Sequence, residues 1–149
     1  MMERWKQLGF NNKRRIKTNL ADRWFSKYIR YRDEWTCQNP KCGKEFDCKN
    51  GKERWRLHCA HIGYGRSNIA TRWEPINCMA LCIGCHDWVD QHPMRAFWLL
   101  SQKLSHEEII WLQLQYKGRH YGKIPDEIEL EHREIYKKKC NEMGLKWRD

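Results

Sequence analysis

Long apolar runs are missing from this 149-residue sequence. No stretch approaches the roughly 18 consecutive apolar residues that a membrane-spanning helix needs, so we expect no membrane span. The opening residues, Met1 to Lys6, also lack the apolar segment of a secretory leader. The two absences together predict a cytoplasmic protein.

Proline is scarce, with 4 residues, and the sequence contains neither an internal repeat nor a low-complexity tract. A solenoid or repeat architecture is therefore excluded. Hydrophobic residues make up 40% and charged residues 32% of the chain, which allows a modest core. We expect one small domain with helical extensions, and a domain of this kind commonly depends on disulfides or a metal ion.

Positive charge dominates, with a formal net charge of +10. Residues 1–36 hold ten Lys or Arg against four acids, residues 37–92 eight against six, and residues 93–149 eleven against nine. We interpret these three segments as a basic N-terminal arm and helix, a central cysteine-rich core and a C-terminal helical extension. The basic surplus suits binding to nucleic-acid phosphates, although a solvated basic surface explains it equally well.

Eight cysteines are present, and four of them form two close pairs. Cys37 and Cys42 flank a turn containing Pro40, while Cys82 and Cys85 precede a helical stretch. In a reducing cytoplasm such pairs bind metal more often than they form disulfides, and four cysteines are a common ligand set for structural zinc. We therefore predict one zinc ion on Cys37, Cys42, Cys82 and Cys85, with Cys48 or Cys59 able to replace one of them. The remaining thiols are expected to be free: Cys48, Cys59, Cys78 and Cys140.

Periodicity predicts an α+β protein. Apolar residues recur at helical spacing over residues 20–32 behind Asn19 as N-cap, and basic residues follow the outward face. These are Arg23, Lys27, Arg30 and Arg32. Short strands are expected over 55–62 and near 72–73, and a helix over 85–91. Three further helices are expected over 94–104, from Ser105 to about residue 118, and from Pro125 to about residue 144.

His61, Asn77 and His86 follow one another at intervals of sixteen and nine residues, and His86 directly follows the second cysteine of Cys82-x2-Cys85. This series resembles the HNH (His-Me finger) nucleases over residues 37–92, in their zinc-binding variant. The wider context is similar to phage HNH proteins, including the lambda NinG (Rap) type of recombination nuclease. The supporting blocks are Phe25-Ser26-Lys27-Tyr28-Ile29-Arg30, Cys59-Ala60-His61-Ile62, Arg66, Thr71-Arg72-Trp73-Glu74-Pro75 and Asn77.

The resemblance implies a small ββα-metal core with structural zinc, flanked by N- and C-terminal helices. It implies a DNA endonuclease, phage-encoded and located in the host cytoplasm, with a role in DNA recombination, packaging or processing. His61 would be the general base, Asn77 would orient it or hold the loop, and His86 would bind a divalent cation, Mg²⁺ or else Mn²⁺, Ni²⁺ or Zn²⁺.

The chain departs from the family at Ala60, where relatives commonly carry an Asp or His metal ligand. Asp90, one helical turn after His86, is the better substitute, since His58 would lie on the strand face opposite His61. Each residue also has an ordinary interpretation: His61 as a structural hydrogen bonder, Asn77 as a turn residue and His86 as a zinc ligand.

Arg66 and Arg72 flank the expected site and could clamp phosphates, with Arg23, Lys27 and Arg30 as further DNA-binding candidates. The partner is expected to be duplex or branched DNA, with a phage protein or a second copy of the chain as further partners. Two alternatives remain open. One is a zinc-containing DNA-binding module with a decayed nuclease site, and the other is an accessory protein that cuts only within a partner complex.

Overall fold

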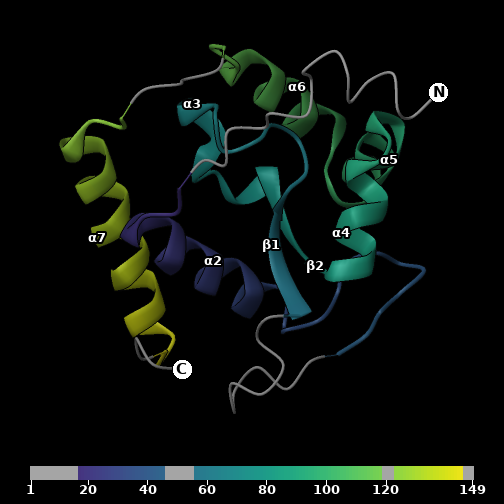
Figure 1. The fold of residues 1–149 in the computed structure, drawn as a ribbon, viewed down its shortest axis with the longest axis horizontal. Coiled ribbons are helices and arrows are strands. Elements are labelled where there is room, and N and C mark those ends of the chain that lie inside the picture. The colour runs from purple at the N-terminus through teal and green to yellow at the C-terminus, as the bar shows by residue number, and fades with distance from the viewer. Residues whose placement is uncertain (1–16, 46–55, 119–122, 146–149) are drawn as a thin grey trace, which may run out of the picture.

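The computed structural model describes residues 17–45, 56–118 and 123–145. A two-stranded sheet lies at the centre, with helices on both sides of it (Figure 1). The basic segment before residue 17, Cys48 and Trp55 fall outside the described residues. In chain order the elements are α2 (Leu20–Arg32), β1 (Leu57–His61), α3 (Ile69–Arg72), the 3-10 helix η2 (Pro75–Asn77), β2 (Cys78–Cys82), α4 (Ile83–Asp90), α5 (Pro93–Lys103), α6 (His106–Gln115) and α7 (Asp126–Glu142).

The two strands are antiparallel, and their register places His61 opposite Cys78 and Leu57 opposite Cys82. Because side chains alternate along a strand, Cys59 and His61 lie on one face of β1, and His58 and Ala60 on the other. β2 is buried along its whole length and continues directly into α4. Over residues 57–90 the order is therefore β1, α3, η2, β2 and α4, within a mixed α+β protein.

Each sheet face is covered by a different helix. On the Cys59 and His61 face lies α2, whose Phe25 ring centroid is 6.2 Å from that of His61. On the opposite face lies α4, whose His86 contacts His58. The two histidine-bearing faces therefore have separate surroundings, one against α2 and the other against α4.

The predicted helix 20–32 is confirmed with the predicted cap. The Asn19 side chain accepts a hydrogen bond from the Asp22 backbone N–H at 2.9 Å, and the Asp22 carboxylate accepts one from the Asn19 N–H. A reciprocal box of this kind satisfies two backbone donors that a helix start otherwise leaves unpaired. It fixes the start of α2, and so the position of Asp22.

The second strand was predicted at the wrong place. Residues 72–73 belong to the end of the short helix α3, and the strand instead covers Cys78–Cys82. Asn68 caps α3 by accepting a hydrogen bond from the Ala70 N–H at 3.2 Å. The Arg72 side chain forms an ion pair with Asp22 of α2. The apolar run before Cys82 is buried on both sides, so it lacks the alternation that marks a half-buried strand.

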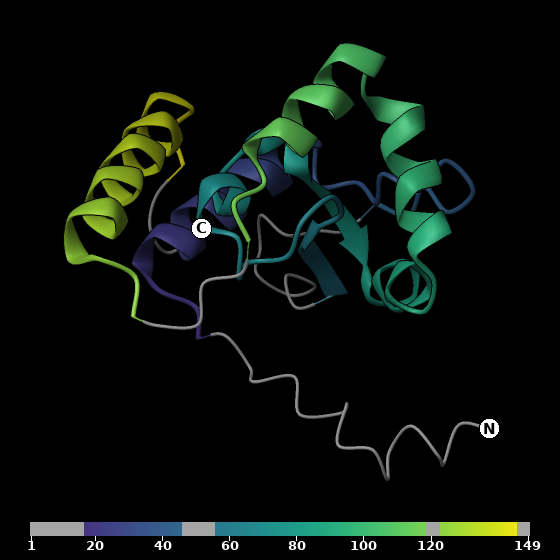
Figure 2. The same cartoon turned by 90° about the horizontal axis from the view of Figure 1, so that it is seen from above.

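The C-terminal helices lie at opposite ends of the molecule (Figures 1 and 2). At one end, α7 packs on α2 through Tyr136 and Cys140, which are buried with Trp24 and Phe25. At the other end, α5 follows α4. Between the two ends lies α6 (Figure 1), which begins after the predicted Ser105 with a capping box formed by Ser105 and Glu108. None of the described helices is both long and apolar enough to cross a membrane.

Candidate functional site

The four paired cysteines come together although forty residues separate the two pairs. The Sγ atoms of Cys37, Cys42, Cys82 and Cys85 all lie within 4.8 Å of one another, and Cys42 Sγ is 3.7 Å from Cys82 Sγ. That separation is close to the sulfur spacing about a tetrahedral ion with metal–sulfur bonds of about 2.3 Å. The predicted cluster is confirmed, and it is compatible with a structural metal ion.

A tight turn shapes the Cys37–Cys42 half of the cluster. The Asn39 carbonyl accepts from the backbone N–H of Cys42 at 2.9 Å and of Gly43 at 3.2 Å, and Gly43 takes φ 62°, which glycine adopts without strain. The Asn39 side chain donates to Cys85 Sγ at 3.4 Å. The turn therefore presents its own thiols and also offers a donor to a sulfur of the other pair.

The thiols of this cluster differ in their acidity. Burial raises the pKa of Cys37 and of Cys85. Burial also acts to raise the pKa of Cys82, but hydrogen bonds from Cys85 outweigh it and lower the pKa. A metal ion binds cysteine as the thiolate. The positive charge of the ion would stabilise the thiolate form, which burial alone disfavours.

His58 and His86 form a close pair on the α4 face of the sheet. Their Nδ1 atoms are 3.0 Å apart, and their rings meet edge to face with centroids 5.3 Å apart. Two imidazole nitrogens at this distance either share one proton in a hydrogen bond or bind a common metal ion, since neighbouring ligands at about 2.1 Å from an ion lie roughly 3.0–3.4 Å apart.

Asp90 lies on the other side of the His86 ring. Its Oδ2 is 3.7 Å from His86 Nε2, whereas His58 approaches Nδ1. Asp90 is therefore placed to hold the His86 ring rather than to share an ion with His58 and His86. The choice of Asp90 over His58 as substitute for the ligand missing at Ala60 stays a prediction, and of the two side chains it is His58 whose Nδ1 lies 3.0 Å from His86 Nδ1.

His61 is fixed at the end of β1, with its ring against α2. Its Nε2 lies 2.9 Å from the Arg72 carbonyl oxygen and must donate to it, so Nδ1 keeps the lone pair. Burial lowers the pKa of His61 to about 4, more than the Arg72 carbonyl raises it. The ring is therefore neutral at pH 7. Among the described residues no hydrogen bond or ring contact joins His61 to His86.

Asn77 holds the loop between β1 and α3. It is fully buried, and its Oδ1 accepts from the Tyr64 N–H at 2.7 Å while its Nδ2 donates to the Tyr64 carbonyl at 2.8 Å and the Thr71 carbonyl at 3.1 Å. A Cβ on Gly63 would run into Asn77 Oδ1. This geometry agrees with the loop-holding role expected of Asn77.

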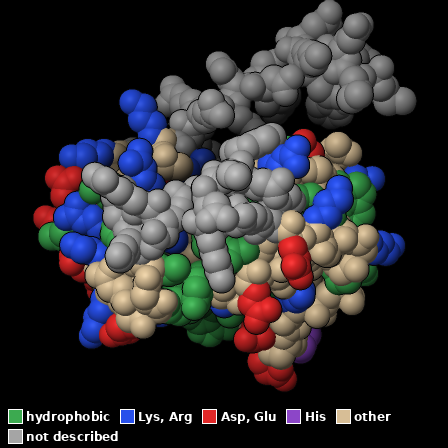
Figure 3. Space-filling view, turned by 90° about the horizontal axis from the view of Figure 1, so that it is seen from below, with side chains coloured by type: hydrophobic (Ala, Val, Ile, Leu, Met, Phe, Trp, Pro, Cys, Tyr) green, Lys and Arg blue, Asp and Glu red, His purple; other side chains and the backbone are tan. Residues whose placement is uncertain are grey.

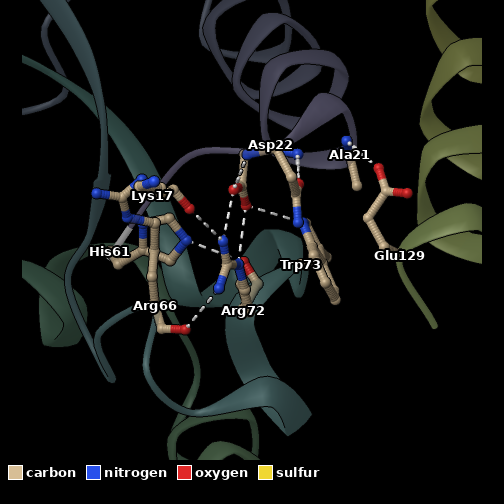
Figure 4. Close-up of polar contacts among 9 residues, drawn as sticks. Lys17, Ala21, Asp22, His61, Arg66, Arg72, Trp73 and Glu129 are labelled. Carbon is tan, nitrogen blue, oxygen red and sulfur yellow. Dashed lines mark hydrogen bonds and ion pairs between the residues drawn. The ribbon is translucent and has the colours of Figure 1, made fainter. Parts of the chain in front are cut away.

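Arg72 was predicted as a phosphate clamp, and this prediction is wrong. Arg72 is 2% exposed. Its side chain forms a bidentate ion pair with Asp22, with Nε–Oδ1 at 2.9 Å and NH2–Oδ2 at 2.6 Å. It also donates to the carbonyls of Lys17 and Arg66 (Figure 4). Arg72 therefore ties α3 to α2, and its carbonyl in turn orients His61.

The other basic candidates differ in their surroundings. Arg23 is exposed, whereas Lys27 is 5% exposed and lies over the Trp24 ring, so the outward position predicted for Lys27 is wrong. Arg30 is half-buried, and its NH1 donates to the Leu57 carbonyl at 3.4 Å. On the face shown in Figure 3, Lys and Arg side chains are interspersed with acidic ones instead of forming one continuous patch.

Arg66 connects the two histidine sites electrostatically. Its side chain lies beside His61 (Figure 4), and its positive charge contributes to lowering the pKa of both His61 and His86, after the larger effect of burial.

Two features of the structure were not predicted from the sequence. One is the His58–His86 pair, which strand alternation could have indicated because His58 shares a face with Ala60. The other is a group formed by Cys59, His61 and Cys78 on the α2 face. Finding it required the strand register, which depends on the correct position of β2.

Comparison with protein-family models, with curated proteins and with solved structures found no match for this chain.

Proposed function

We propose that the protein is a metal-dependent endonuclease of the HNH type that hydrolyses DNA phosphodiester bonds, with Zn²⁺ as the structural ion on Cys37, Cys42, Cys82 and Cys85. Four thiolates are the ligand set typical of closed structural zinc sites. The ion would join the turn at 37–42 to the start of α4, which carries His86.

The observation that carries the proposal is the 3.0 Å approach of His58 Nδ1 and His86 Nδ1. One nitrogen comes from β1 and the other from the helix that the cysteine cluster anchors. Both are suited to a divalent ion that accepts imidazole, and the negative charge of Asp90, with Oδ2 3.7 Å from His86 Nε2, would favour the tautomer with its proton on Nε2 and leave Nδ1 for the ion. A divalent ion bound there would polarise the scissile phosphate and stabilise the leaving oxygen.

The remaining roles follow from the positions of the side chains. His61 would accept a proton from the attacking water at Nδ1, because Nε2–H is engaged by the Arg72 carbonyl. Its lowered pKa keeps the ring unprotonated at neutral pH but makes it a weak base. Arg66, whose side chain lies beside His61 (Figure 4), would bind the phosphate near that ring. Asn77 would keep the loop that carries Arg66 in place through its bonds to Tyr64 and Thr71.

A specific observation also favours a second function, a zinc-containing DNA-binding module with a decayed nuclease site. Ala60 offers no donor to a metal, and His61 is a weak base because burial lowers its pKa to about 4. Such a module would bind DNA mainly through phosphates, with a strong dependence on salt concentration. It would bind without a divalent ion and leave every form of DNA intact.

The two functions are separated by the initial rate of supercoiled-plasmid nicking for wild type and His61→Ala, both loaded with one equivalent of zinc. If His61 is the base, the variant should be slower by roughly 10²–10⁴-fold. His106→Ala, an exposed histidine at the start of α6, is the matched control and should cleave like wild type. Wild-type cleavage by His61→Ala would refute the base assignment. Binding without cleavage by every form would favour the DNA-binding module.

A further inference from the structure

A second group of metal-ligand side chains lies on the α2 face of the sheet, opposite the His58–His86 pair. The Sγ atoms of Cys59 and Cys78 and one ring nitrogen of His61 all lie within 4.8 Å of one another. A tetrahedral zinc ion holds sulfur and nitrogen ligands about 3.5–3.8 Å apart. Small rotations of the three side chains would bring them to that spacing.

The strand register argues for a metal site and against a disulfide. Cys59 pairs with Ala80 and Cys78 pairs with His61, so the two cysteines are diagonal neighbours across the ladder. Diagonal residues have Cα atoms about 7–8 Å apart, beyond the roughly 4.4–6.8 Å that disulfides span. Both thiols are free in the structure and so remain available as ligands.

His61 is prepared to act as a ligand. Its Nε2 donates to the Arg72 carbonyl at 2.9 Å, which leaves the Nδ1 lone pair available. Metal-binding histidines almost always make this kind of bond with the second nitrogen, because it fixes the tautomer and the ring orientation. The Asp22–Arg72 ion pair holds the carbonyl itself in place.

The charges of the three ligands also suit a buried divalent ion. Two thiolates and a neutral imidazole balance the charge of Zn²⁺, so the assembly would be neutral, and a neutral assembly avoids the large cost of burying net charge. Cys78 is 2% exposed, so the ion would be shielded from solvent on that side. Cys59 and His61 are half-buried, so solvent could supply a fourth ligand from their side.

We propose that Cys59, His61 and Cys78 form a second zinc site, distinct from the four-cysteine cluster and completed by water. Zinc binding would release the two thiol protons and occupy the His61 lone pair. The consequence for catalysis rests on the function proposed above. If His61 is the general base, zinc in this site inhibits cleavage, and the protein responds to the concentration of free zinc.

The first test is zinc stoichiometry by native mass spectrometry during titration of the full chain. The titration uses His86→Ala, which lacks the divalent-ion site proposed on His58 and His86. This chain should bind two zinc ions, and only one when Cys59→Ser is added. Adding Cys140→Ser instead, which alters a buried thiol that bonds to the Trp24 carbonyl, should keep two. Saturation of His86→Ala at one ion, or two ions when Cys59→Ser is added, would overturn the proposal.

A second measurement uses wild type alone and so does not depend on the folding of a variant. Iodoacetamide should modify Cys59 when one equivalent of zinc is present, and saturating zinc should protect it. Unchanged labelling of Cys59 at saturating zinc would refute the site.

The link to catalysis has its own readout. The second equivalent of zinc should stop plasmid nicking by wild type, and this inhibition should be lost in Cys59→Ser. Two bound ions together with undiminished nicking would keep the metal site and refute His61 as the base. The stoichiometry thus tests the site even if the protein proves not to be a nuclease.

Discussion

Replacing Asp22 by Asn should test how the fold holds the site, because the Asp22 carboxylate lies at the junction of α2 and α3. It accepts from Arg72 Nε and NH2, from Trp73 Nε1 at 3.1 Å and from the Asn19 backbone. Asp22→Asn keeps the shape and removes the charge, so the buried guanidinium of Arg72 loses its partner. Breaking one side of a buried pair costs about 3–5 kcal/mol.

For a chain of this size each kcal/mol lowers Tm by about 2–4 °C, so the drop should be roughly 6–20 °C. The assay is thermal unfolding of the zinc-loaded protein by circular dichroism, with urea unfolding to give the free energy. Glu142→Gln, at an exposed position near the end of α7, is the control and should unfold like wild type. A loss below about 1 kcal/mol in Asp22→Asn would show that the pair does not hold α3.

The pH dependence of this difference gives a further check. Burial acts to raise the pKa of Asp22, but the hydrogen bond and charge of Arg72 outweigh it, and the pKa falls below the usual 3.8. A carboxylate with a lowered folded pKa contributes stability that is complete above its unfolded pKa and is lost as the pH falls through the folded value. The free-energy difference between wild type and Asp22→Asn should therefore stay constant from pH 8 to pH 5. A difference that shrinks within this window would contradict the pairing.

Three further perturbations address the metal sites and the loop. Cys42→Ser, or chelation of the ion, should abolish cooperative unfolding followed by near-UV circular dichroism. Structural zinc contributes about 10–16 kcal/mol, as much as a whole domain's stability of about 5–15 kcal/mol. An unchanged Tm would refute a stabilising role for an ion on the four cysteines. Gly63→Ala should lower the free energy of unfolding in urea by about 1–3 kcal/mol, because the added Cβ would clash with Asn77. Gly65→Ala, where a Cβ meets open space, should leave it unchanged. Equal losses in the two variants would refute this contact. Asp90→Ala should raise the Mn²⁺ concentration for half-maximal cleavage by about 10–100-fold, and an unchanged requirement would remove Asp90 from the site.

The sequence predicted those elements whose signals are local. Asn19 and Asp22 mark the start of α2 by side-chain chemistry alone, and Ser105 and Glu108 do the same for α6. The cysteine cluster was also predictable, because two close pairs with turn residues have few other uses. Local capping and ligand spacing do not depend on the tertiary fold.

What failed depended on tertiary contacts. Lys27 and Arg72 have the charge of surface residues, yet Arg72 is buried because Asp22, fifty residues away, pairs with it. β2 was misplaced because a strand buried on both faces has no alternating pattern. The His58–His86 pair and the Cys59–His61–Cys78 group require the register between two strands, and short strands leave that register undefined in the sequence.

The most direct test of the central claim is cleavage of supercoiled plasmid by protein loaded with one equivalent of zinc, in Mg²⁺, Mn²⁺ or EDTA, comparing wild type with His86→Ala and with His106→Ala as the control. Circular dichroism under each condition would separate loss of activity from loss of fold. We predict nicking that requires the added ion, persists in His106→Ala and disappears in His86→Ala. Equal nicking by His86→Ala, or no cleavage by folded, zinc-loaded wild type in either metal, would contradict the assignment of a metal-dependent nuclease site to this protein.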